Sequence, residues 1–329
     1  MNSATHATES VVRAEALGYS YPGGSHALNG VSFDVGRGEV FGLLGRNGAG
    51  KTTTVRLLTG LIAPTEGRGY LFGKDITECG PIDRARIGVV LQSESFDTVS
   101  VEENLRLYAY LWGVGREIAK ARTEEFLELF ELRTVREKAP WLLSGGERRR
   151  FQVARELMHD MELLFLDEAT VGVDALTRAR ILDYLRDRVK AGLSILFTTH
   201  ILSEADRICD RIGILHSGRL LSIATPNQLK AMYSGPREVR LEVEIAPAPD
   251  DLKSLHARLE SDGVDFSVSE AKGLRFVFVS KHAEVLVTRI AQWAVERRLA
   301  ISKIGIQEAT LEDAFIQLLS AQHQPEREP

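Results

Sequence analysis

Short apolar runs alternate with helical patterns over the N-terminal part of the chain. In the segments between these runs, apolar residues recur at the spacing of amphipathic helices. This alternation predicts an α/β fold, in which a largely parallel sheet is covered by helices. The runs with the length of buried strands are Val40–Leu44, Ile87–Leu91, Leu163–Leu166, Ser194–Thr198 and Ile212–Leu215.

The segment from Val99 to Arg155 interrupts that alternation. Ser100 and Glu103 have the spacing of a capping box, and the helical pattern behind them runs to Leu111. Glu117–Leu132 has the pattern of a second amphipathic helix. We therefore expect a helical subdomain over about residues 99–155, inserted into the α/β core.

A smaller unit is predicted after a change of composition around Met232–Arg237. Its elements have the order βαββαβ, which is typical of a small ferredoxin-like α+β domain over residues 236–320. A last helix is expected from Thr310, which forms a second capping box with Asp313. The strands are expected at Val239–Glu244, Phe266–Val268, Arg275–Val279 and Ile301–Ile306, and the helices at Asp251–Leu259 and Ala283–Arg298.

Composition narrows the class of protein. With 329 residues, 44% hydrophobic and 26% charged, the chain has the make-up of a globular protein with about two domains. A formal net charge of -5 argues against a basic surface over the whole molecule, so no nucleic-acid partner is expected. Cys79 and Cys209 are far apart, which excludes a disulfide scaffold and a Cys-rich zinc site and predicts two buried thiols.

The hydropathy pattern also bears on membranes. No run approaches the roughly 18 apolar residues of a membrane span. The polar segment Met1–Ser10 lacks the apolar core of a secretory signal. We expect a cytosolic protein, or one that reaches a membrane only through a partner.

The strongest chemical signal is the run Gly45-Arg46-Asn47-Gly48-Ala49-Gly50-Lys51-Thr52, which fits the phosphate-loop pattern G-x-x-x-x-G-K-[ST]. It follows an apolar strand and precedes a helical pattern over Thr52–Thr59. Glycines let the backbone turn so that several N–H groups point at one phosphate chain, and the helix N-terminus adds positive charge. Lys51 would supply a charge for the β and γ phosphates, and the Thr52 hydroxyl can ligate Mg²⁺.

Two carboxylates end the apolar run Leu163–Leu166. Asp167 and Glu168 would lie at the carboxyl end of a parallel strand, where ligands bind in open α/β sheets. Asp167 can hold Mg²⁺, and Glu168 can orient and deprotonate an attacking water. Acids are common at strand ends, so the functional interpretation depends on the phosphate loop.

Three further features are weak by themselves. Leu143–Glu147 is either a second anion site at a helix N-terminus or an ordinary N-cap at Ser144, ahead of an Arg-rich helical pattern over Arg148–His159. Gln92 and His200 each follow a predicted strand. Such residues are usually polar groups at strand ends, and only their positions single them out.

In this order, the segments resemble the nucleotide-binding subunit of ATP-binding-cassette (ABC) transporters, over about residues 11–232. LSGG-type residues between the phosphate loop and the acidic strand are particular to this family. The resemblance implies a P-loop NTPase core with ATP and Mg²⁺ as cofactors. It is carried by Tyr21, Gly45–Thr52, Gln92, Leu143–Glu147, Leu163–Glu168, Val171–Asp174 and His200.

The resemblance implies a set of residues that bind ATP. Tyr21 would stack on the adenine, with Tyr19 as a rival. The signature residues Ser144, Gly145, Gly146 and Glu147 would bind the γ-phosphate held by the other subunit, and Asp174 would be the aspartate of the D-loop. The phosphate-loop residues in this set are Gly45, Asn47, Gly48, Ala49, Gly50, Lys51, Thr52 and Thr53.

It also implies the catalytic residues. Glu168 would be the catalytic glutamate, and His200 would contact the γ-phosphate. Lys51 would stabilise charge on the phosphates, and Gln92 would contact the attacking water and sense the transport partner. The residues that would contact the metal are Thr52, Gln92 and Asp167.

Four positions depart from the usual family pattern. Glu147 replaces a Gln, and Arg46, Leu91 and Ala169 stand where Pro is frequent. None of these changes removes a functional side chain. We therefore expect an active rather than a degenerate site.

The C-terminal part narrows the resemblance. Thr225-Pro226, Leu229 and the run Leu311–Phe315 resemble ABC-2-type exporters and the drug-resistance (daunorubicin-type) ATPase subunits. This implies an ATPase subunit that acts as two copies, or with a homologous subunit, on a separate integral membrane permease at the cytoplasmic face of the membrane. The C-terminal domain would then serve regulation or dimer contact.

Two alternatives stay open. A soluble ABC ATPase acting on ribosomes or in DNA repair usually carries two cassettes or inserted zinc or coiled-coil segments, which this chain lacks. A non-catalytic nucleotide-sensing subunit is opposed by the presence of Glu168 and His200.

Overall fold

The computed structural model describes residues 10–321, except 25, 94–95, 234, 246, 262, 265 and 273. The chain divides into two compact units, Met1–Pro226 and Asn227–Pro329. The division falls at the start of helix α8 (Pro226–Tyr233), somewhat before the composition change at Met232. The first unit contains all the residues predicted to carry chemistry.

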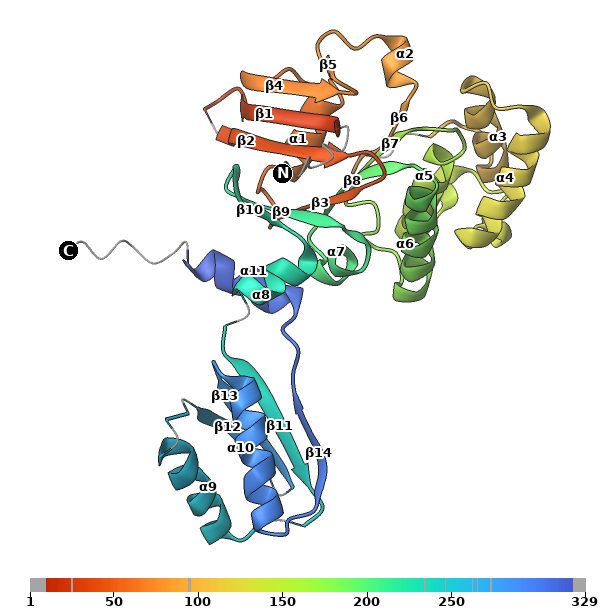
Figure 1. The fold of residues 1–329 in the computed structure, drawn as a ribbon. Helices are drawn as coiled ribbons and strands as arrows, with labels where there is room; N and C mark the ends of the chain where they lie inside the picture. Colours follow the sequence, from red (N-terminus) through yellow and green to blue (C-terminus); the bar gives the residue numbers. More distant parts are fainter. Residues whose placement is uncertain are drawn as a thin grey trace, which may run out of the picture. The chain divides into compact units, whose positions relative to one another are not determined.

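A six-stranded sheet with the order β10-β9-β3-β8-β7-β6 runs through the first unit (Figure 1). All its neighbouring pairs are parallel except β10 with β9, which confirms the predicted α/β core. Strands β3, β7 and β8 are buried throughout, as continuous apolar strands of a covered parallel sheet should be. The strands are β3 (Val40–Leu44), β6 (Ile87–Val90), β7 (Leu163–Asp167), β8 (Ser194–Thr199), β9 (Arg211–His216) and β10 (Arg219–Ala224).

Strand β10 extends this sheet through a hairpin that the sequence analysis did not predict. Ser217 and Gly218 join the two strands with φ values of 47° and 75°. Positive φ at both central residues is the signature of a type I′ turn, whose twist matches that of paired strands. The available signal was the Ser217-Gly218 pair, one residue after the apolar run Ile212–Leu215.

A second, antiparallel sheet with the order β2-β1-β4-β5 was also missed. Its signal is plain in β2, where Val31, Phe33 and Val35 alternate with exposed or half-buried residues. A period of two is typical of a half-buried strand, and such a strand contains no continuous apolar run. The strands are β1 (Ser10–Ser20), β2 (His26–Gly36), β4 (Glu66–Leu71) and β5 (Lys74–Asp75).

Helix α1 (Lys51–Leu58) contacts both sheets. Its residues Val55, Leu57 and Leu58 are buried in a core that also receives side chains from both sheets. Within that core the rings of Phe33 (β2) and Phe41 (β3) stack with centroids 5.0 Å apart. The helix that follows the phosphate loop is thereby fixed on two sides.

The helical insertion is present between β6 and β7. Helix α4 ends at Leu129, before the predicted Leu132, and Glu131 has a φ of 53° that no helix continues through. Helix α5 starts at Gly145 rather than Arg148, because Ser144 and Glu147 form a capping box, and it ends at Glu156 rather than His159. The elements are α3 (Val101–Leu111), α4 (Arg116–Leu129), the 3₁₀ turns Arg133–Val135 and Pro140–Leu142, and α5 (Gly145–Glu156).

Three further helices belong to the first unit: α2 (Pro81–Arg84), α6 (Ala175–Lys190) and α7 (Leu202–Ile208). The two cysteines are free and buried, as predicted. None of the helices in the described part of the chain combines the length and the apolar composition that a bilayer crossing requires.

The second unit confirms the βαββαβ order. Its four strands have the antiparallel order β12-β13-β11-β14, which is that of a ferredoxin-like domain. Val239 and Leu241 of the sheet are buried in one core with Ile290 and Trp293 of α10. The elements are β11 (Arg237–Val243), α9 (Pro249–Ser261), β12 (Ser267–Lys272), β13 (Arg275–Ser280), α10 (Ala283–Glu296), β14 (Ile301–Ile306) and α11 (Leu311–Ala321).

Candidate functional site

The phosphate loop joins the buried strand β3 to the N-terminus of α1. Gly50 precedes the helix with a φ of 110°, which glycine adopts without strain. A Cβ at Gly50 would lie 2.7 Å from the carbonyl oxygen of Ala27, and a Cβ at Gly45 would lie 2.4 Å from that of Leu215. Both positions therefore require glycine, and the loop is tightly packed.

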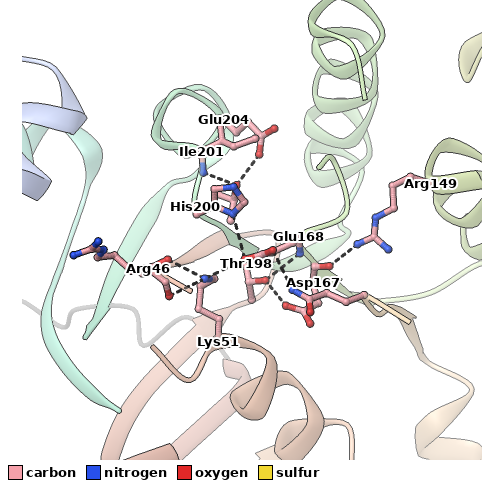
Figure 2. Close-up of polar contacts among 12 residues, drawn as sticks. Arg46, Lys51, Arg149, Asp167, Glu168, Thr198, His200, Ile201 and Glu204 are labelled. Carbon is pink, nitrogen blue, oxygen red and sulfur yellow. Dashed lines mark hydrogen bonds and ion pairs between the residues drawn. The ribbon is translucent and has the colours of Figure 1, made fainter. Parts of the chain in front are cut away.

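Lys51 is the first residue of α1 and is buried, with 5% of its surface exposed. Its Nζ donates hydrogen bonds to the carbonyl oxygens of Gly45 (2.8 Å) and Arg46 (3.3 Å). The same atom lies 3.1 Å from Oε1 of Glu168 (Figure 2). The phosphate loop and the acidic strand end are thus joined by an ion pair.

Glu168 is the centre of a cluster formed by residues far apart in the sequence. Gln92 donates from Nε2 to Glu168 Oε2 at 3.0 Å, and His200 Nδ1 lies 3.3 Å from Oε1. All four residues predicted to be catalytic therefore meet at one carboxylate. Gln92, Glu168 and His200 stand just beyond the carboxyl ends of β6, β7 and β8, and Lys51 follows β3 through the phosphate loop. Parallel strands bring these ends together at one edge of the sheet.

The backbone of Glu168 is held in an unusual conformation. Its φ is 51°, a left-handed value that costs a non-glycine residue about 1–2 kcal/mol. Its N–H donates to the carbonyl (3.0 Å) and the hydroxyl (3.1 Å) of Thr198, which hold the peptide in place (Figure 2). Sequence reasoning missed Thr198, although two polar residues at the end of an apolar strand were a signal.

The protonation state of Glu168 is set by opposing effects. Burial raises the pKa of its carboxyl, but the hydrogen bond and charge of Lys51, with a further contribution from His200, more than offset it. The pKa therefore lies below its ordinary value. Glu168 is ionised at neutral pH and can accept a proton.

Asp167 is fully buried beside this cluster. Its Oδ1 accepts a hydrogen bond of 2.6 Å from the Thr198 hydroxyl. Its Oδ2 is also buried and has no hydrogen-bond partner among the described residues. A buried carboxylate oxygen without a partner is costly, and a bound cation would remove that cost.

Tyr21 lies beside the phosphate-loop helix. Its hydroxyl is 3.2 Å from Oγ1 of Thr53, and its ring meets that of Tyr19 edge-on at 4.9 Å. Thr52, between Lys51 and Thr53, is half-buried in the first turn of α1. The two candidate aromatic residues thus lie together, and Tyr21 is the one bonded to the loop.

An open hollow of about 540 Å³ adjoins the loop. His216, the last residue of β9, and Ser217, in the turn after it, line the hollow and were not predicted. Both residues belong to the β9–β10 hairpin, which the sequence analysis did not predict. The other lining residues are Arg46, Asn47, Gly48, Ala49 and His200.

The signature residues lie elsewhere on the unit. Ser144 and Glu147 cap α5, the Glu147 N–H donating to Ser144 Oγ and the Ser144 N–H to Glu147 Oε2. A Cβ at Gly146 would lie 2.8 Å from the carbonyl oxygen of Gly172, so α5 begins against the D-loop segment. No hydrogen bond or ion pair among the described residues joins Ser144 or Glu147 to the phosphate loop of the same chain.

Asp174 caps helix α6. Its Oδ1 accepts from the N–H of Thr177 at 3.0 Å, and its Oδ2 lies 3.8 Å from the guanidinium of Arg150. The structure therefore gives Asp174 a structural role at a helix N-terminus. It does not bring Asp174 into the cluster around Glu168.

Similarity to known proteins shows the family of this chain. Residues 28–171 match the protein family described as ABC transporter. The chain is 36% identical over 299 residues to the daunorubicin resistance ATP-binding protein DrrA3 of Streptomyces coeruleorubidus, covering 90% of this chain and 92% of that protein. It is 31% identical over 313 residues to the linearmycin resistance ATP-binding protein LnrL of Bacillus subtilis (strain 168), covering 94% and 98%.

A solved structure resembles the fold as well. The ATP-binding cassette MJ0796, in a dimeric post-hydrolysis state bound to ADP and Pi, matches with a TM-score of 0.60 and 25% identity. The match covers 65% of this chain and 98% of that structure.

Proposed function

The chain belongs to the family of ABC transporter ATP-binding proteins, and from this premise we propose that it is the ATP-hydrolysing subunit of an ABC-2-type, drug-resistance exporter. The observation that carries the proposal is the cluster in which Lys51, Gln92 and His200 meet the Glu168 carboxylate. The comparisons give no support to the alternative of a soluble ABC ATPase acting on ribosomes or in DNA repair.

ATP is held by the phosphate loop and the N-terminus of α1. The loop N–H groups and the helix end attract the phosphates, and Lys51 adds a full charge. Lys51 also pairs with Glu168, so an arriving phosphate competes with that carboxylate for the charge of Lys51. Tyr21, bonded to Thr53 of the loop, is placed to stack on the base.

The residues present fit a divalent cation beside the phosphates. Asp167 Oδ2 is a buried carboxylate oxygen without a partner among the described residues, and Mg²⁺ prefers oxygen ligands. Thr52, Gln92 and Asp167 would hold the ion. When bound, it would neutralise charge on the phosphate oxygens.

Hydrolysis requires a water in line with the γ-phosphate. Glu168, ionised and rigidly held by Thr198, accepts the proton of that water. Gln92 bonds to the same carboxylate and orients the water, while His200 contacts the γ-phosphate. Lys51 stabilises the negative charge that develops on the phosphate.

The signature residues complete the site of a second subunit. No hydrogen bond or ion pair among the described residues joins Ser144 or Glu147 to the phosphate loop of the same chain. With Gly145 and Gly146 they form a helix N-terminus, which attracts anions. Two copies, or one copy and a homologous subunit, would therefore enclose two ATP molecules. The dimeric state of the related cassette supports this arrangement.

Closing of this dimer would drive a separate integral membrane permease at the cytoplasmic face of the membrane. We place the ATPase domain at residues 11–232 and a regulatory or dimer-contact domain at 236–320. The similarity to resistance proteins extends over the C-terminal part, because LnrL is matched over 94% of this chain.

Replacement of Glu168 by Gln tests the proposal. The amide keeps the shape of the side chain but accepts no proton, so kcat should fall by about 10²–10⁴-fold while ATP still binds. The loss of a negative charge near the phosphates should also trap the ATP-bound dimer. Turnover, nucleotide affinity and mass by light scattering, each with and without Mg²⁺, measure these effects.

Two results decide between the parts of the proposal. Ser144→Arg in the Glu168→Gln chain should abolish the trapped dimer but keep the ATP contact through Lys51, because Ser144 serves the opposite site. Normal turnover by Glu168→Gln would remove Glu168 as the base. A monomer with ATP would contradict a homodimer, and adding the homologous subunit then tests a heterodimer.

A further inference from the structure

One face of α5 is buried although it is made of polar residues. Arg149, Gln152 and Glu156 follow each other at the spacing of one helix face and expose only 7%, 5% and 6% of their surface. Arg149 and Gln152 bond to backbone at the carboxyl ends of β6 and β7, and Glu156 bonds to β6 and to α3. The sequence predicted only an Arg-rich helix here.

Arg149 bridges two strand ends with one guanidinium. Its Nη1 donates to the carbonyl oxygen of Leu91 and its Nη2 to that of Asp167, both at 2.6 Å (Figure 2 shows the second contact). Leu91 directly precedes Gln92, and Asp167 directly precedes Glu168. The same side chain therefore fixes the backbone next to two residues proposed to be catalytic.

Gln152 reinforces the first of these contacts. Its Nε2 donates to the carbonyl oxygens of Leu91 (3.0 Å) and Ser93 (3.1 Å), on both sides of Gln92. Its Oε1 accepts from Arg149 Nη1 at 2.6 Å, so the two side chains act as one unit. The loop that carries Gln92 is thus held from α5 rather than by a neighbouring strand.

The sheet topology explains why a guanidinium is needed. Strands β6 and β7 pair up to Val90 and Leu166, and beyond that point Asp167 pairs with Thr198 of β8. The carbonyls of Leu91 and Asp167 lie one residue past the last β6–β7 pair. A planar guanidinium has five N–H donors in fixed directions and can span two such carbonyls, which a lysine ammonium does less well.

A second attachment joins α5 to the same strand. Glu156 accepts a hydrogen bond from the N–H of Val89 (2.9 Å) and one from the hydroxyl of Tyr108 on α3 (2.7 Å). Helix α5 therefore cannot shift as a body without moving β6. Its first turn holds the signature residues, so the helix connects them to the strand ends.

We propose that Arg149, supported by Gln152, is a positioning residue that transmits the docking of the signature helix on the partner's nucleotide to Gln92 and Glu168 of its own site. This inference rests on the proposed function for its account of what docks on α5. Its structural part, that Arg149 orders the two strand ends, stands on the hydrogen bonds alone.

Arg149→Met tests the proposal through turnover. A misplacement of catalytic groups by about 1 Å costs on the order of 10²-fold in rate, so kcat should fall by about that factor while KM for ATP changes less than about threefold. In the Glu168→Gln chain, Arg149→Met should still trap the ATP-bound dimer. A variant that lost folding would lose both, and a positioning variant loses only turnover.

Arg122→Met is the matched control. Arg122 also donates to a carbonyl, that of Met158 (3.0 Å), and pairs with Asp160, but it does not touch the strand ends. Its loss should leave kcat within about twofold. An equal loss of kcat in both variants, or normal kcat in Arg149→Met, would overturn the proposal.

A second variant and a second measurement keep the test independent of stability and of the proposed function. Gln152→Met removes the bonds on both sides of Gln92 and the bond to Arg149, but it leaves the bonds from Arg149 to the Leu91 and Asp167 carbonyls. It should lower kcat by about tenfold, which corresponds to about 1.4 kcal/mol, the net worth of a hydrogen bond. Hydrogen exchange of the nucleotide-free protein should show faster exchange at residues 91–93 and 167–169 in Arg149→Met, and partial recovery in Arg149→Lys. Unchanged exchange there would refute the positioning role, whereas a native chain without ATP turnover would instead refute the proposed function.

Discussion

The two units of the chain place their charges in opposite ways. In the first unit, Lys51, Asp167, Arg149 and Glu156 are almost completely buried. Each is hydrogen-bonded to backbone groups or to a neighbouring polar side chain. In the described part of the second unit, charged side chains lie at the surface, and the buried polar side chain is that of Ser280.

The difference in charge burial is explained by the proposed phosphate site of the first unit. Burying a charge costs several kcal/mol unless it is paired and hydrogen-bonded, so an interior with many charges is poor evidence for stability. The charges of the first unit are instead arranged around the carboxyl ends of the strands, where phosphates are proposed to bind. The second unit has an apolar core and surface ion pairs such as Arg258 with Glu296, which stabilise a fold only slightly.

The largest expected effect is a loss of stability in the second unit that leaves ATP binding by the first unit unchanged. Trp293→Ala should destabilise the second unit by about 3–5 kcal/mol, because a large buried aromatic side chain is removed. Its indole N–H also donates to Ser254 Oγ at 3.2 Å. Hydrogen exchange of β11 and α10 peptides measures the loss, and ATP affinity should stay unchanged.

Val295→Ala is the control for that substitution. Val295 lies on the same helix but is 77% exposed, so its truncation should cost less than about 0.5 kcal/mol. A fall in ATP affinity with Trp293→Ala would show that the second unit takes part in binding.

Lys51→Ala tests the role of the buried charges in the first unit. The loss of a buried cation that bonds to the phosphates should weaken ATP binding by about 1.5–3 kcal/mol, or roughly 10–150-fold. Titration calorimetry in Mg²⁺-free buffer measures the affinity. Lys74→Ala, which removes a surface lysine paired with Asp83, should have no effect; equal losses in both variants would contradict the role of Lys51.

Tyr21→Ala should reduce ATP affinity by about 1–2 kcal/mol through lost stacking on the base. Tyr21→Phe keeps the ring and removes only the hydrogen bond to Thr53, so most of the affinity should remain. The same titration serves here. If Tyr19→Ala has the larger effect, the stacking residue is Tyr19.

The smallest expected effect is a pH dependence in the stability of the first unit. His159 is buried against Trp112, with ring centroids 4.3 Å apart, and burial lowers its pKa. The unfolded chain binds a proton as the pH falls below about 6.5 while the folded chain does not, so stability falls with decreasing pH by at most about 1.4 kcal/mol per pH unit.

His159→Phe keeps the stacked ring and removes the titration. Urea unfolding of the first unit at pH 7, 6 and 5 should show a shallower slope for this variant than for the native chain. His256 of the second unit provides the control, because it lies outside the unit whose unfolding is followed, so His256→Gln should leave the slope of the first unit unchanged. An unaltered slope in His159→Phe would mean that the ring is protonated in the fold.

Some elements were readable from the chain and others were not. The buried strands were predicted because parallel strands covered on both faces are apolar throughout. The antiparallel sheet was missed because its strands bury one face only, as Val31, Phe33 and Val35 do. The start of α5 was misplaced because the glycines after Ser144 do not resemble a helix, although the capping box fixes its first turn.

The sequence by itself determined the phosphate loop. Its conformation is local: Gly50 needs a positive φ, and the strand before it and helix after it are strongly patterned. The identity of the carboxylates at the end of β7 and the polar residues after β6 and β8 could be read in the same way.

Only the tertiary structure decided what those residues touch. Glu168 meets Lys51, Gln92 and His200 because four strand ends converge in one sheet, and neither the distances nor the bonds exist in any local segment. Arg149 appeared in the sequence as one of several arginines on a helix. Strand β7 pairs with β8 beyond the end of β6, so the carbonyls of Leu91 and Asp167 are not joined by the β6–β7 pairing. Arg149 hydrogen-bonds to both of these carbonyls.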